Sequence, residues 1–241
     1  KARAGKKKVI LELGGNAGVI IDETADVAYA VKRVVTGGFA YAGQSCISVQ
    51  RVFVHDRLYD EFARLLAAKV QSLVVGHPLD STTDVGPMID AGEVDRIEAW
   101  VKEAVGAGAR VQAGGTRISR SVYAPTVLDS VPETARVCAQ EVFAPLVGLY
   151  RFTDFGQAIA AVNRSRYGLQ AGVFTNDLTH MLAAYDAIEV GGVIVNDVPS
   201  WRIDHMPYGG VKDSGIGREG PRYTIEEMTE PKLLVINRNM Q

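Results

Sequence analysis

The chain has 241 residues, of which 47% are apolar and 22% are charged, and its formal net charge is −2. This balance is typical of a globular protein with a substantial core, and it excludes an intrinsically disordered chain. Acidic and basic residues are mixed along the sequence, so nothing indicates binding to nucleic acid or to an anionic membrane.

No apolar run reaches the roughly 18 to 20 residues that a membrane span requires, and no signal peptide is visible. The chain has two cysteines, Cys46 and Cys138, and they lie far apart. This argues against a disulfide scaffold and favours a cytoplasmic chain with a reactive thiol. The basic residues between Lys1 and Lys8 are expected to form a solvated lead-in. The chain does not begin with Met, and the motifs below favour a piece of a longer protein.

In chain order, the apolar pattern predicts a strand at 9–13, a helix at 25–39, a strand at 49–54, a helix at 59–74, a loop at 76–90 and a helix at 94–105. It then predicts strands at 110–113, 123–128 and 146–152, a helix at 155–163, a strand at 169–174, a helix at 178–188 and strands at 192–196 and 233–236. This alternation indicates an α/β fold with a mostly parallel sheet flanked by helices and a C-terminal strand extension. We expect one main domain, residues 1–222, and an extension at 223–241.

A glycine-rich segment between Gly215 and Gly220 matches the G-x-G-x-x-G pattern of dinucleotide-binding proteins. That fingerprint must follow an apolar strand and open a βαβ unit. Here the preceding residues are polar, and too few residues follow Gly220 for such a unit. We therefore interpret the segment as a turn that allows backbones to pack closely.

Cys46 lies just after a glycine-containing turn, between a predicted helix and a predicted strand. In such a place the backbone holds the sulfur, and nearby N–H groups can stabilise a thiolate or an oxyanion. From the residues alone, the cysteine can be a nucleophile or an inert core residue.

Glu12 lies in an otherwise apolar strand-like run that ends at Gly14-Gly15. A carboxylate buried there needs a partner or has a raised pKa, which suits a general base. The alternative is a glutamate at a strand end that faces solvent. The two glycines permit the close approach of another chain segment or a ligand.

These segments carry a family resemblance. The sequence LELGGNAG at 11–18 resembles the glutamate signature of the aldehyde dehydrogenase superfamily, and FAYAGQSC at 39–46 resembles its cysteine signature. The segment from Glu141 to Pro145 is similar to the family's E-x-F-G-P element, and that from Pro207 to Gly215 to its P-[FY]-G-G-x-K-x-S-G element. The matching segments follow in the family's order over nearly the whole chain. Four residues depart from the family pattern: Gly18, Ser48, Gln50 and Ala144.

The resemblance implies that Cys46 attacks an aldehyde and that Glu12 activates the water that hydrolyses the resulting thioester. It further implies NAD or NADP as cofactor, with Glu141, Phe143 and Leu13 near the nicotinamide end. The N–H of Cys46 is expected to help hold the oxyanion. The role of Lys212 is open, and Cys138 is interpreted as a small core residue.

The substrate pocket is expected to include Ser45 and Ile47, which flank the nucleophile. The other expected pocket residues are Trp201, Arg202 and Tyr208. An arginine at the pocket mouth would favour an aldehyde that bears an anionic group, although a solvated surface arginine is an equal alternative. The four histidines show no metal-ligand spacing, so no metal is expected.

The family's cofactor domain lies mainly before the glutamate signature, so it is largely absent from this chain. We expect the isolated chain to be inactive as a dehydrogenase. The strand at 233–236 resembles the family's subunit-contact strand, which predicts a homo-oligomer, a dimer or a tetramer. Two other functions stay open: a cofactor-independent thiol esterase or acyl-transfer module, and a non-catalytic assembly module.

Overall fold

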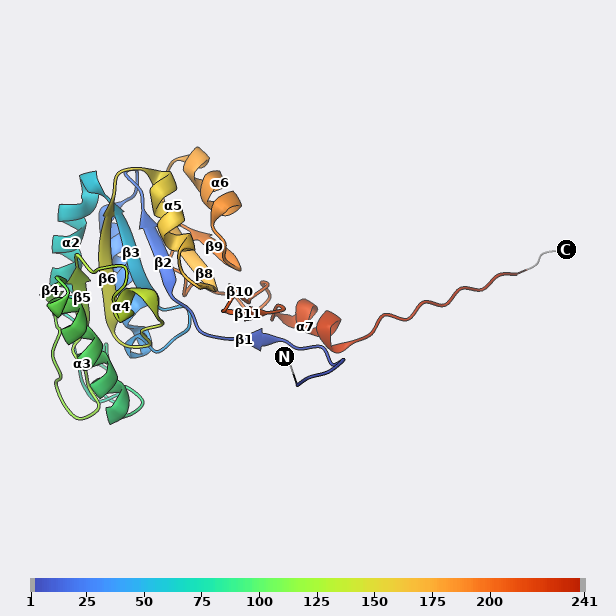
Figure 1. Ribbon diagram of the computed structural model, residues 1–241, viewed down its shortest axis with the longest axis horizontal. Helices are drawn as coiled ribbons and strands as arrows, with labels where there is room; N and C mark the ends of the chain where they lie inside the picture. The colour runs from blue at the N-terminus through green and yellow to red at the C-terminus, as the bar shows by residue number, and fades with distance from the viewer. Residues whose placement is uncertain (1–2, 239–241) are drawn as a thin grey trace.

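The computed structural model describes residues 3–238 and consists of one large sheet covered by helices on both faces (Figure 1). Lys1 and the last residues of the expected extension, 239–241, lie outside the described residues. Across the sheet the strands are β4 (Arg110–Ala113), β5 (Thr126–Asp129), β6 (Leu146–Phe152), β3 (Val49–His55), β2 (Ala17–Ile21), β8 (Gln170–Phe174) and β9 (Gly192–Val195). Only β4 is antiparallel to its neighbour, so the prediction of a mostly parallel α/β sheet is confirmed.

Strand β2 lies in the middle of this sheet, and the sequence pattern did not predict it. All five of its residues are buried, and it pairs in parallel with β3 on one side and β8 on the other. The run from Gly14 to Gly18 resembles a turn in composition, which hides the strand. A Cβ on Gly18 would lie 2.9 Å from a methyl carbon of Val162, so glycine lets a helix pack closely on the strand.

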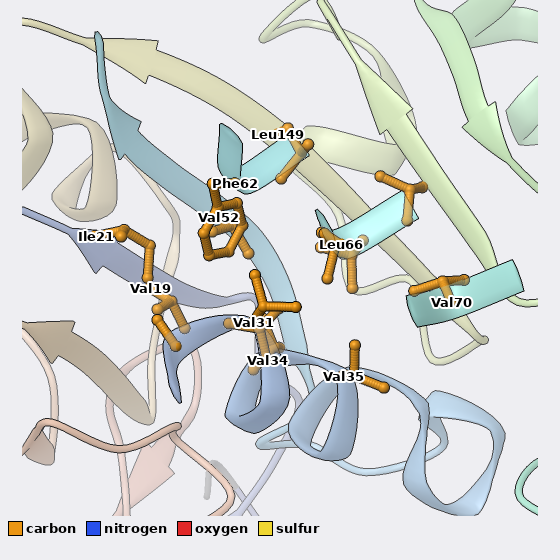
Figure 2. Close-up of a cluster of buried hydrophobic side chains, with 14 of the residues drawn as sticks. Val19, Ile21, Val31, Val34, Val35, Val52, Phe62, Leu66, Val70 and Leu149 are labelled. Carbon is orange, nitrogen blue, oxygen red and sulfur yellow. The ribbon is translucent and has the colours of Figure 1, made fainter. Parts of the chain in front are cut away.

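Helices cover the two faces because side chains along each strand alternate between them. Val19 and Ile21 face α1 (Val27–Phe39) and α2 (Asp56–Gln71), as Figure 2 shows. Ile20 faces the opposite side, against α5 (Phe155–Asn163) and α6 (Leu178–Ala187). Two further helices, α3 (Ala91–Gly106) and α4 (Arg136–Ala139), pack near β5 in a separate apolar cluster. Aspartates cap four of the helices at Asp26, Asp90, Asp154 and Asp177.

Two short antiparallel ribbons lie below the sheet, beside the N-terminal segment (Figure 1). Strand β1 (Leu11–Glu12) pairs with β11 (Gly215–Ile216), and β7 (Tyr167–Gly168) pairs with β10 (Val211–Lys212). Gly215 has a φ of 148°, and a Cβ on it would lie 2.0 Å from the carbonyl oxygen of Leu11. The interpretation of this glycine-rich segment as a site of close backbone packing is therefore confirmed.

The C-terminal region differs from the expected strand extension. Residues 221–228 form helix α7 (Pro221–Met228), which begins with a proline, a residue favoured at the first helical position. The expected domain boundary after residue 222 falls inside this helix. Residues 233–236, predicted as a strand, are exposed and unpaired among the described residues, and Figure 1 shows this segment running away from the body. A strand forms only when a neighbour completes its hydrogen bonds, and residues 3–238 bring none there.

None of the helices in the described part of the chain is long and apolar enough to cross a membrane.

Candidate active site

The predicted functional side chains gather at one edge of the parallel sheet. Cys46 precedes β3, Gly15 precedes β2 and Glu141 precedes β6, and these three strands are parallel neighbours. The amino ends of parallel strands meet at the same edge of a sheet. The sheet topology therefore brings together three segments that are far apart in the sequence.

The turn before Cys46 is strained. Helix α1 ends at Phe39 and continues into a short 3₁₀ turn, η1 (Ala40–Gly43). Tyr41 and Ala42 have φ values of 52° and 54°, a left-handed conformation that costs on the order of 1–3 kcal/mol for a residue with a side chain. At Gly43 a Cβ would lie 2.1 Å from the carbonyl oxygen of Ala144, so this position requires glycine. The surrounding packing imposes this turn, and the turn sets the position of Cys46.

The two glycines after Glu12 provide the close approach that the sequence predicted. A Cβ on Gly15 would lie 1.9 Å from the carbonyl oxygen of Cys46, and one on Gly14 would lie 2.5 Å from Oε2 of Glu141. The Ser214 hydroxyl donates a 2.7 Å hydrogen bond to the carbonyl oxygen of Gly14. This loop therefore packs directly against both the cysteine and the Glu141 carboxylate.

Cys46 is half-buried, and its sulfur contacts a tyrosine hydroxyl that in turn contacts a carboxylate. Its Sγ lies 3.2 Å from the hydroxyl oxygen of Tyr208, and that hydroxyl lies 3.4 Å from Oε1 of Glu12. Burial, together with the Glu12 carboxylate, raises the pKa of the Cys46 thiol to about 11, and the Tyr208 hydroxyl opposes this rise. The thiol is thus protonated at neutral pH and needs a base.

Glu12 occupies a strand end and is exposed in this chain, so the expectation of a buried carboxylate is wrong for the chain alone. The strand is only two residues long, and among the described residues it pairs with a single strand, β11. Its carboxylate nevertheless faces the thiol through Tyr208. Both sequence alternatives therefore hold in part, since the residue is solvent-exposed and lies beside the cysteine.

Glu141 and Phe143 lie on the other side of Gly14-Gly15. The Glu141 carboxylate accepts a 2.8 Å hydrogen bond from the N–H of Gly15. Burial raises the pKa of Glu141, although the Gly15 N–H opposes the shift. Phe143 has a φ of 47° and is 40% exposed, and Leu13 is 46% exposed. A carboxylate therefore lies near two apolar side chains that the described chain leaves uncovered.

The expected pocket residues separate into two groups. Ile47 and Tyr208 form a small buried cluster with Leu169 that packs against Cys46. The guanidinium carbon of Arg202 lies 3.9 Å from the centroid of the Tyr208 ring. Its only ion pair among the described residues is a 3.5 Å contact with Glu219.

Ser45 and Trp201 do not join this group. Ser45 lines a small pocket together with Gly15, Glu141 and Phe143. It therefore lies on the Glu141 side of the cysteine. Trp201 is 42% exposed and does not belong to the buried cluster beside Cys46.

Three buried polar residues, which the sequence did not indicate as part of the site, hold its loops in place through hydrogen bonds. Asn16 donates to the carbonyl oxygens of Cys138 and Gln140, and Gln50 binds the same segment on both sides, including the N–H of Val142. Both side chains are buried and hold the loop that carries Glu141. The unusual glutamine after the cysteine signature thus has a structural role. Polar residues inside an apolar strand were the signal that could have found them.

Arg51 is the third of these residues. Its guanidinium is buried and donates to the carbonyl oxygens of Ala161 and Val162 in the last turn of α5, and to that of Asn16. The last carbonyls of a helix lack partners within the helix and carry partial negative charge. Arg51 therefore ties β3 to the end of α5 and to the Asn16 loop without a carboxylate partner.

The remaining sequence candidates lie outside the site. Lys212 donates a 2.8 Å hydrogen bond to the carbonyl oxygen of Asn163 and pairs with Glu189, which indicates a structural role. Cys138 is 8% exposed, and burial raises its pKa, as expected of a core thiol. Over residues 3–238 no group of three or more His, Cys, Asp or Glu side chains is arranged to hold a metal ion.

Comparison with known proteins places these residues in a family. The model of the aldehyde dehydrogenase family matches residues 1–234. The 3-sulfolactaldehyde dehydrogenase of Priestia aryabhattai is 50% identical over 237 residues, which are 98% of this chain and 50% of that protein.

Comparison with solved structures gives the same family. Aldehyde dehydrogenase 21 of Physcomitrella patens, in complex with the reaction product succinate, superposes with a TM-score of 0.95 at 48% identity, covering 98% of this chain and 49% of that one. The glyceraldehyde-3-phosphate dehydrogenase GapN of Methanocaldococcus jannaschii, complexed with NADP, superposes with a TM-score of 0.91 at 40% identity, covering 94% and 49%. The chain thus spans about half the length of the relatives it matches. With a family model matched over nearly its whole length and close relatives in both sequence and structure, this chain belongs to the aldehyde dehydrogenase family.

Proposed function

We propose that this chain is the thiol-bearing half of an enzyme that oxidises an aldehyde to a carboxylic acid with NAD⁺ or NADP⁺. One observation carries the proposal: the Cys46 sulfur, the Tyr208 hydroxyl and the Glu12 carboxylate form one continuous contact. A thiol and a carboxylate base in contact are the two groups that thioester chemistry requires.

In this proposal Cys46 is the nucleophile and Glu12 is the general base. The thiolate of Cys46 adds to the aldehyde carbon to give a thiohemiacetal, which is oxidised to a thioester. Glu12 then takes a proton from the water that attacks the thioester and releases the acid. No acceptor among the described residues binds the N–H of Cys46, so it is free to stabilise the oxyanion in both addition steps.

The residues beside Gly14 fit the nicotinamide end of the cofactor. Glu141 offers a carboxylate for ribose hydroxyls, and Leu13 and Phe143 offer exposed apolar surface for the ring. When bound, NAD(P)⁺ supplies the hydride acceptor for the oxidation of the thiohemiacetal. Since the chain spans about half of its relatives, we expect it to bind the cofactor weakly by itself and to lack dehydrogenase turnover. A fluorescence titration with NADPH checks this, and tight binding by the chain alone would contradict it.

The nucleophile and the base can be tested without cofactor. We expect p-nitrophenyl acetate to acetylate Cys46 in a burst of nitrophenol, visible as an acetyl adduct by intact mass and peptide mapping. Glu12→Gln should slow the release of the acetyl group. Cys138→Ser, which changes the buried thiol outside the site, is the matched control and should leave the burst intact. No adduct in a cooperatively folded sample, or an adduct on Cys138, would contradict the proposal.

We further propose that the aldehyde bears an anionic group and that Arg202 recognises it. The Arg202 guanidinium lies over the Tyr208 ring, whose hydroxyl contacts Cys46, and its ion pair with Glu219 is loose at 3.5 Å. Three proteins similar to this chain are named for, or hold, compounds with a sulfonate, a carboxylate or a phosphate: 3-sulfolactaldehyde, succinate and glyceraldehyde-3-phosphate. Arginine is well suited to all three of these anions.

Two activated esters separate this proposal from a surface role of Arg202. With mono-p-nitrophenyl succinate, which carries a carboxylate, Arg202→Leu should slow acylation of Cys46 by about tenfold through the loss of a charge-assisted hydrogen bond. With neutral p-nitrophenyl butyrate the rate should change little. Arg222→Leu, which removes an exposed arginine on α7, is the control. Equal slowing with both esters would refute an anion-binding role.

We also propose that the chain assembles into a homo-oligomer, a dimer or a tetramer, through its C-terminal segment. The side chains at 233–236 are 68–86% exposed although all four are large and apolar. Such a segment favours pairing with a second copy, which would complete the strand that the sequence predicts. Light scattering after gel filtration should show an oligomer for the chain and a smaller species after truncation at residue 230. An unchanged mass would contradict the proposal.

A further inference from the structure

Tyr208 is held in place from several sides. It is 3% exposed, and its ring packs with Ile47 and Leu169 in the cluster beside Cys46. Its backbone forms a bridge with Glu219, in which each residue's N–H donates to the carbonyl oxygen of the other. The guanidinium of Arg202 covers one face of the ring. A side chain fixed in this way keeps its hydroxyl at a defined distance from its neighbours.

The hydroxyl of Tyr208 lies between the two reacting groups. It lies 3.4 Å from Oε1 of Glu12, to which it can donate, and 3.2 Å from Sγ of Cys46, a contact in which either atom can be the donor. A hydroxyl has one proton and two lone pairs. While it donates to the Glu12 carboxylate, it can interact with the thiol only by accepting the S–H proton. In that arrangement both hydrogen bonds run from the sulfur toward the carboxylate.

We propose that Tyr208 is a catalytic residue whose hydroxyl relays the thiol proton of Cys46 to Glu12 and then holds the thiolate. This inference rests on the function proposed above, because it assumes that Cys46 is the nucleophile and Glu12 the base. It assigns to the hydroxyl a role that packing of an aromatic ring beside the thiol does not require.

The proton balance of the step is simple. The S–H bond of Cys46 breaks as a new bond forms between that proton and the Tyr208 oxygen. The original hydroxyl proton passes at the same time to Oε1 of Glu12. Tyr208 ends neutral, Cys46 becomes a thiolate and Glu12 becomes a neutral carboxylic acid, and nothing is oxidised or reduced. Glu12, which is exposed, then releases this proton to solvent before it acts as the base for the hydrolytic water. The proton now on Tyr208 points at the sulfur, so the hydroxyl donates a charge-assisted hydrogen bond to the thiolate.

The state of the thiol explains why such a path matters. Burial, together with the Glu12 carboxylate, raises the pKa of Cys46 to about 11, so few molecules carry a thiolate at neutral pH. The same contact with Tyr208 lowers the pKa and therefore favours the thiolate. A pocket that desolvates its nucleophile needs a donor that stabilises the anion once it forms.

Phenylalanine at this position removes the hydroxyl and leaves the ring. The family element that Pro207–Gly215 resembles takes either Phe or Tyr at the position of Tyr208, so Tyr208→Phe is expected to fold. The matched control is Tyr123→Phe, because Tyr123 is equally buried at 1% exposed and its hydroxyl has no partner among the described residues. Circular dichroism and urea unfolding verify that both variants are folded.

The first measurement is the rate at which iodoacetamide alkylates Cys46, followed by mass between pH 7 and pH 10. Below the pKa of the thiol this rate is proportional to the fraction of thiolate. We expect Tyr208→Phe to lower the rate at pH 8 by about tenfold, since the thiolate loses one charge-assisted hydrogen bond. Tyr123→Phe should match the wild type. Equal rates for Tyr208→Phe and the wild type over this range would overturn the proposal.

The second measurement tests the relay itself. The acetylation rate with p-nitrophenyl acetate is measured at pH 7 in mixtures of H₂O and D₂O. If two protons move together, the rate falls along a curve as the deuterium fraction rises. With Tyr208→Phe only one proton can move, and the dependence should become linear. A linear dependence in the wild type would show direct transfer from sulfur to carboxylate and would overturn the relay.

The two measurements also separate this inference from the proposed function. Alkylation of Cys46 requires no ester, aldehyde or cofactor. Alkylation that depends on Tyr208 without any acetyl burst would support the thiolate contact and remove the proposed function. A burst with alkylation that is independent of Tyr208 would keep the function and remove this inference.

Discussion

The two edges of the parallel sheet carry polar side chains of opposite character. At the amino edge, Glu141 is half-buried with one backbone N–H donor, and burial raises its pKa. At the carboxyl edge, Asp22 follows β2 and is 1% exposed, yet its pKa is lowered despite burial. Three side chains contact one of its carboxylate oxygens: the hydroxyls of Thr24 and Thr175 and the Nδ1 of His180.

The two edges differ in how fully the described chain supplies partners for their polar and apolar side chains. At the carboxyl edge the chain satisfies its own buried charge, and the contacts tie together β2, β8 and α6. Both edges contain residues with a left-handed φ, among them Tyr41 and Phe143 at the amino edge and Ser130 and Asn196 at the carboxyl edge. At the amino edge, however, the apolar side chains of Leu13 and Phe143 are exposed. The carboxyl edge therefore contributes to stability, and the amino edge is the one at which we propose the chemistry.

The largest effect is expected at Cys46. Cys46→Ser should reduce the acylation rate by at least about a thousandfold, because a serine hydroxyl is a much weaker nucleophile than a thiolate. The urea midpoint should move little, since the substitution is nearly isosteric. Nitrophenol release and urea unfolding measure the two quantities. A large loss of stability would show that this edge also holds the fold together and would break the contrast between the edges.

At the carboxyl edge we expect a large loss of stability and no change in acylation. Asp22→Ala should lower the free energy of unfolding by about 3 kcal/mol, because it leaves buried hydroxyls and a histidine without their acceptor. Acylation of Cys46 in the folded protein should be unchanged. Urea unfolding and the nitrophenol burst test both statements. Asp80→Ala is the matched control and should leave the urea midpoint in place, because Asp80 is an exposed loop aspartate whose side chain binds only Thr82 among the described residues.

An intermediate effect is expected at Gly15. In Gly15→Ala the new Cβ would lie 1.9 Å from the carbonyl oxygen of Cys46, so the loop must move. We expect a loss of about 1–3 kcal/mol in stability together with slower acylation, because the same movement displaces the cysteine. Gly106→Ala at the end of α3, where a Cβ meets nothing within 4 Å, should not destabilise the fold. If Gly15→Ala is destabilised but acylates at the wild-type rate, the position of this loop does not determine the position of Cys46.

The pH dependence of stability should follow Asp22. The pKa of Asp22 is lowered in the folded state from a usual value of 3.8. A lowered pKa contributes stability above the unfolded value, and this contribution is lost as pH falls through the folded value. The urea midpoint should therefore fall steeply below about pH 4, which lies near the ordinary pKa of an aspartate. In Asp22→Asn this part of the slope should disappear, and an identical slope would contradict the assignment.

The smallest effect on stability is expected at Glu141, and its pH dependence is opposite in sign to that of Asp22. A carboxyl whose pKa is raised on folding contributes stability below the unfolded pKa and loses it as pH rises through the folded value. At pH 7 the ionised Glu141 is therefore unfavourable. Glu141→Gln should stabilise the chain at pH 7 by less than about 1 kcal/mol, given partial exposure. The gain should vanish at pH 4. A loss of stability at pH 7 would mean that the Gly15 hydrogen bond outweighs burial.

Local patterns predicted most of the regular elements. Strand β6 and helix α5 were predicted with the bounds that the structure has, because period-2 and period-3.6 apolar patterns depend only on neighbouring residues. Strand β2 was missed, since Gly14, Gly15 and Gly18 suppress the pattern, although they are needed for close packing. The predicted strand at 233–236 has apolar residues but no neighbour within the described chain.

The sequence predicted which residues belong to the candidate site but not how they lie relative to one another. Cys46, Glu12 and Glu141 were chosen from motif resemblance and from the cost of placing charge in an apolar run. The residues that hold them were not found, because Asn16, Gln50 and Ser214 act through backbone atoms more than 30 residues away.

The sequence by itself determined most of the helices and strands and the family motifs that contain Cys46 and Glu12. Each of these depends on residue type and on spacing over a few positions. Only the tertiary structure decided that Tyr208 lies between Cys46 and Glu12, that Ser45 belongs to the Glu141 side, and that Asp22 is a satisfied buried charge. Those relations join segments up to 196 residues apart, and their geometry is set by sheet order and packing.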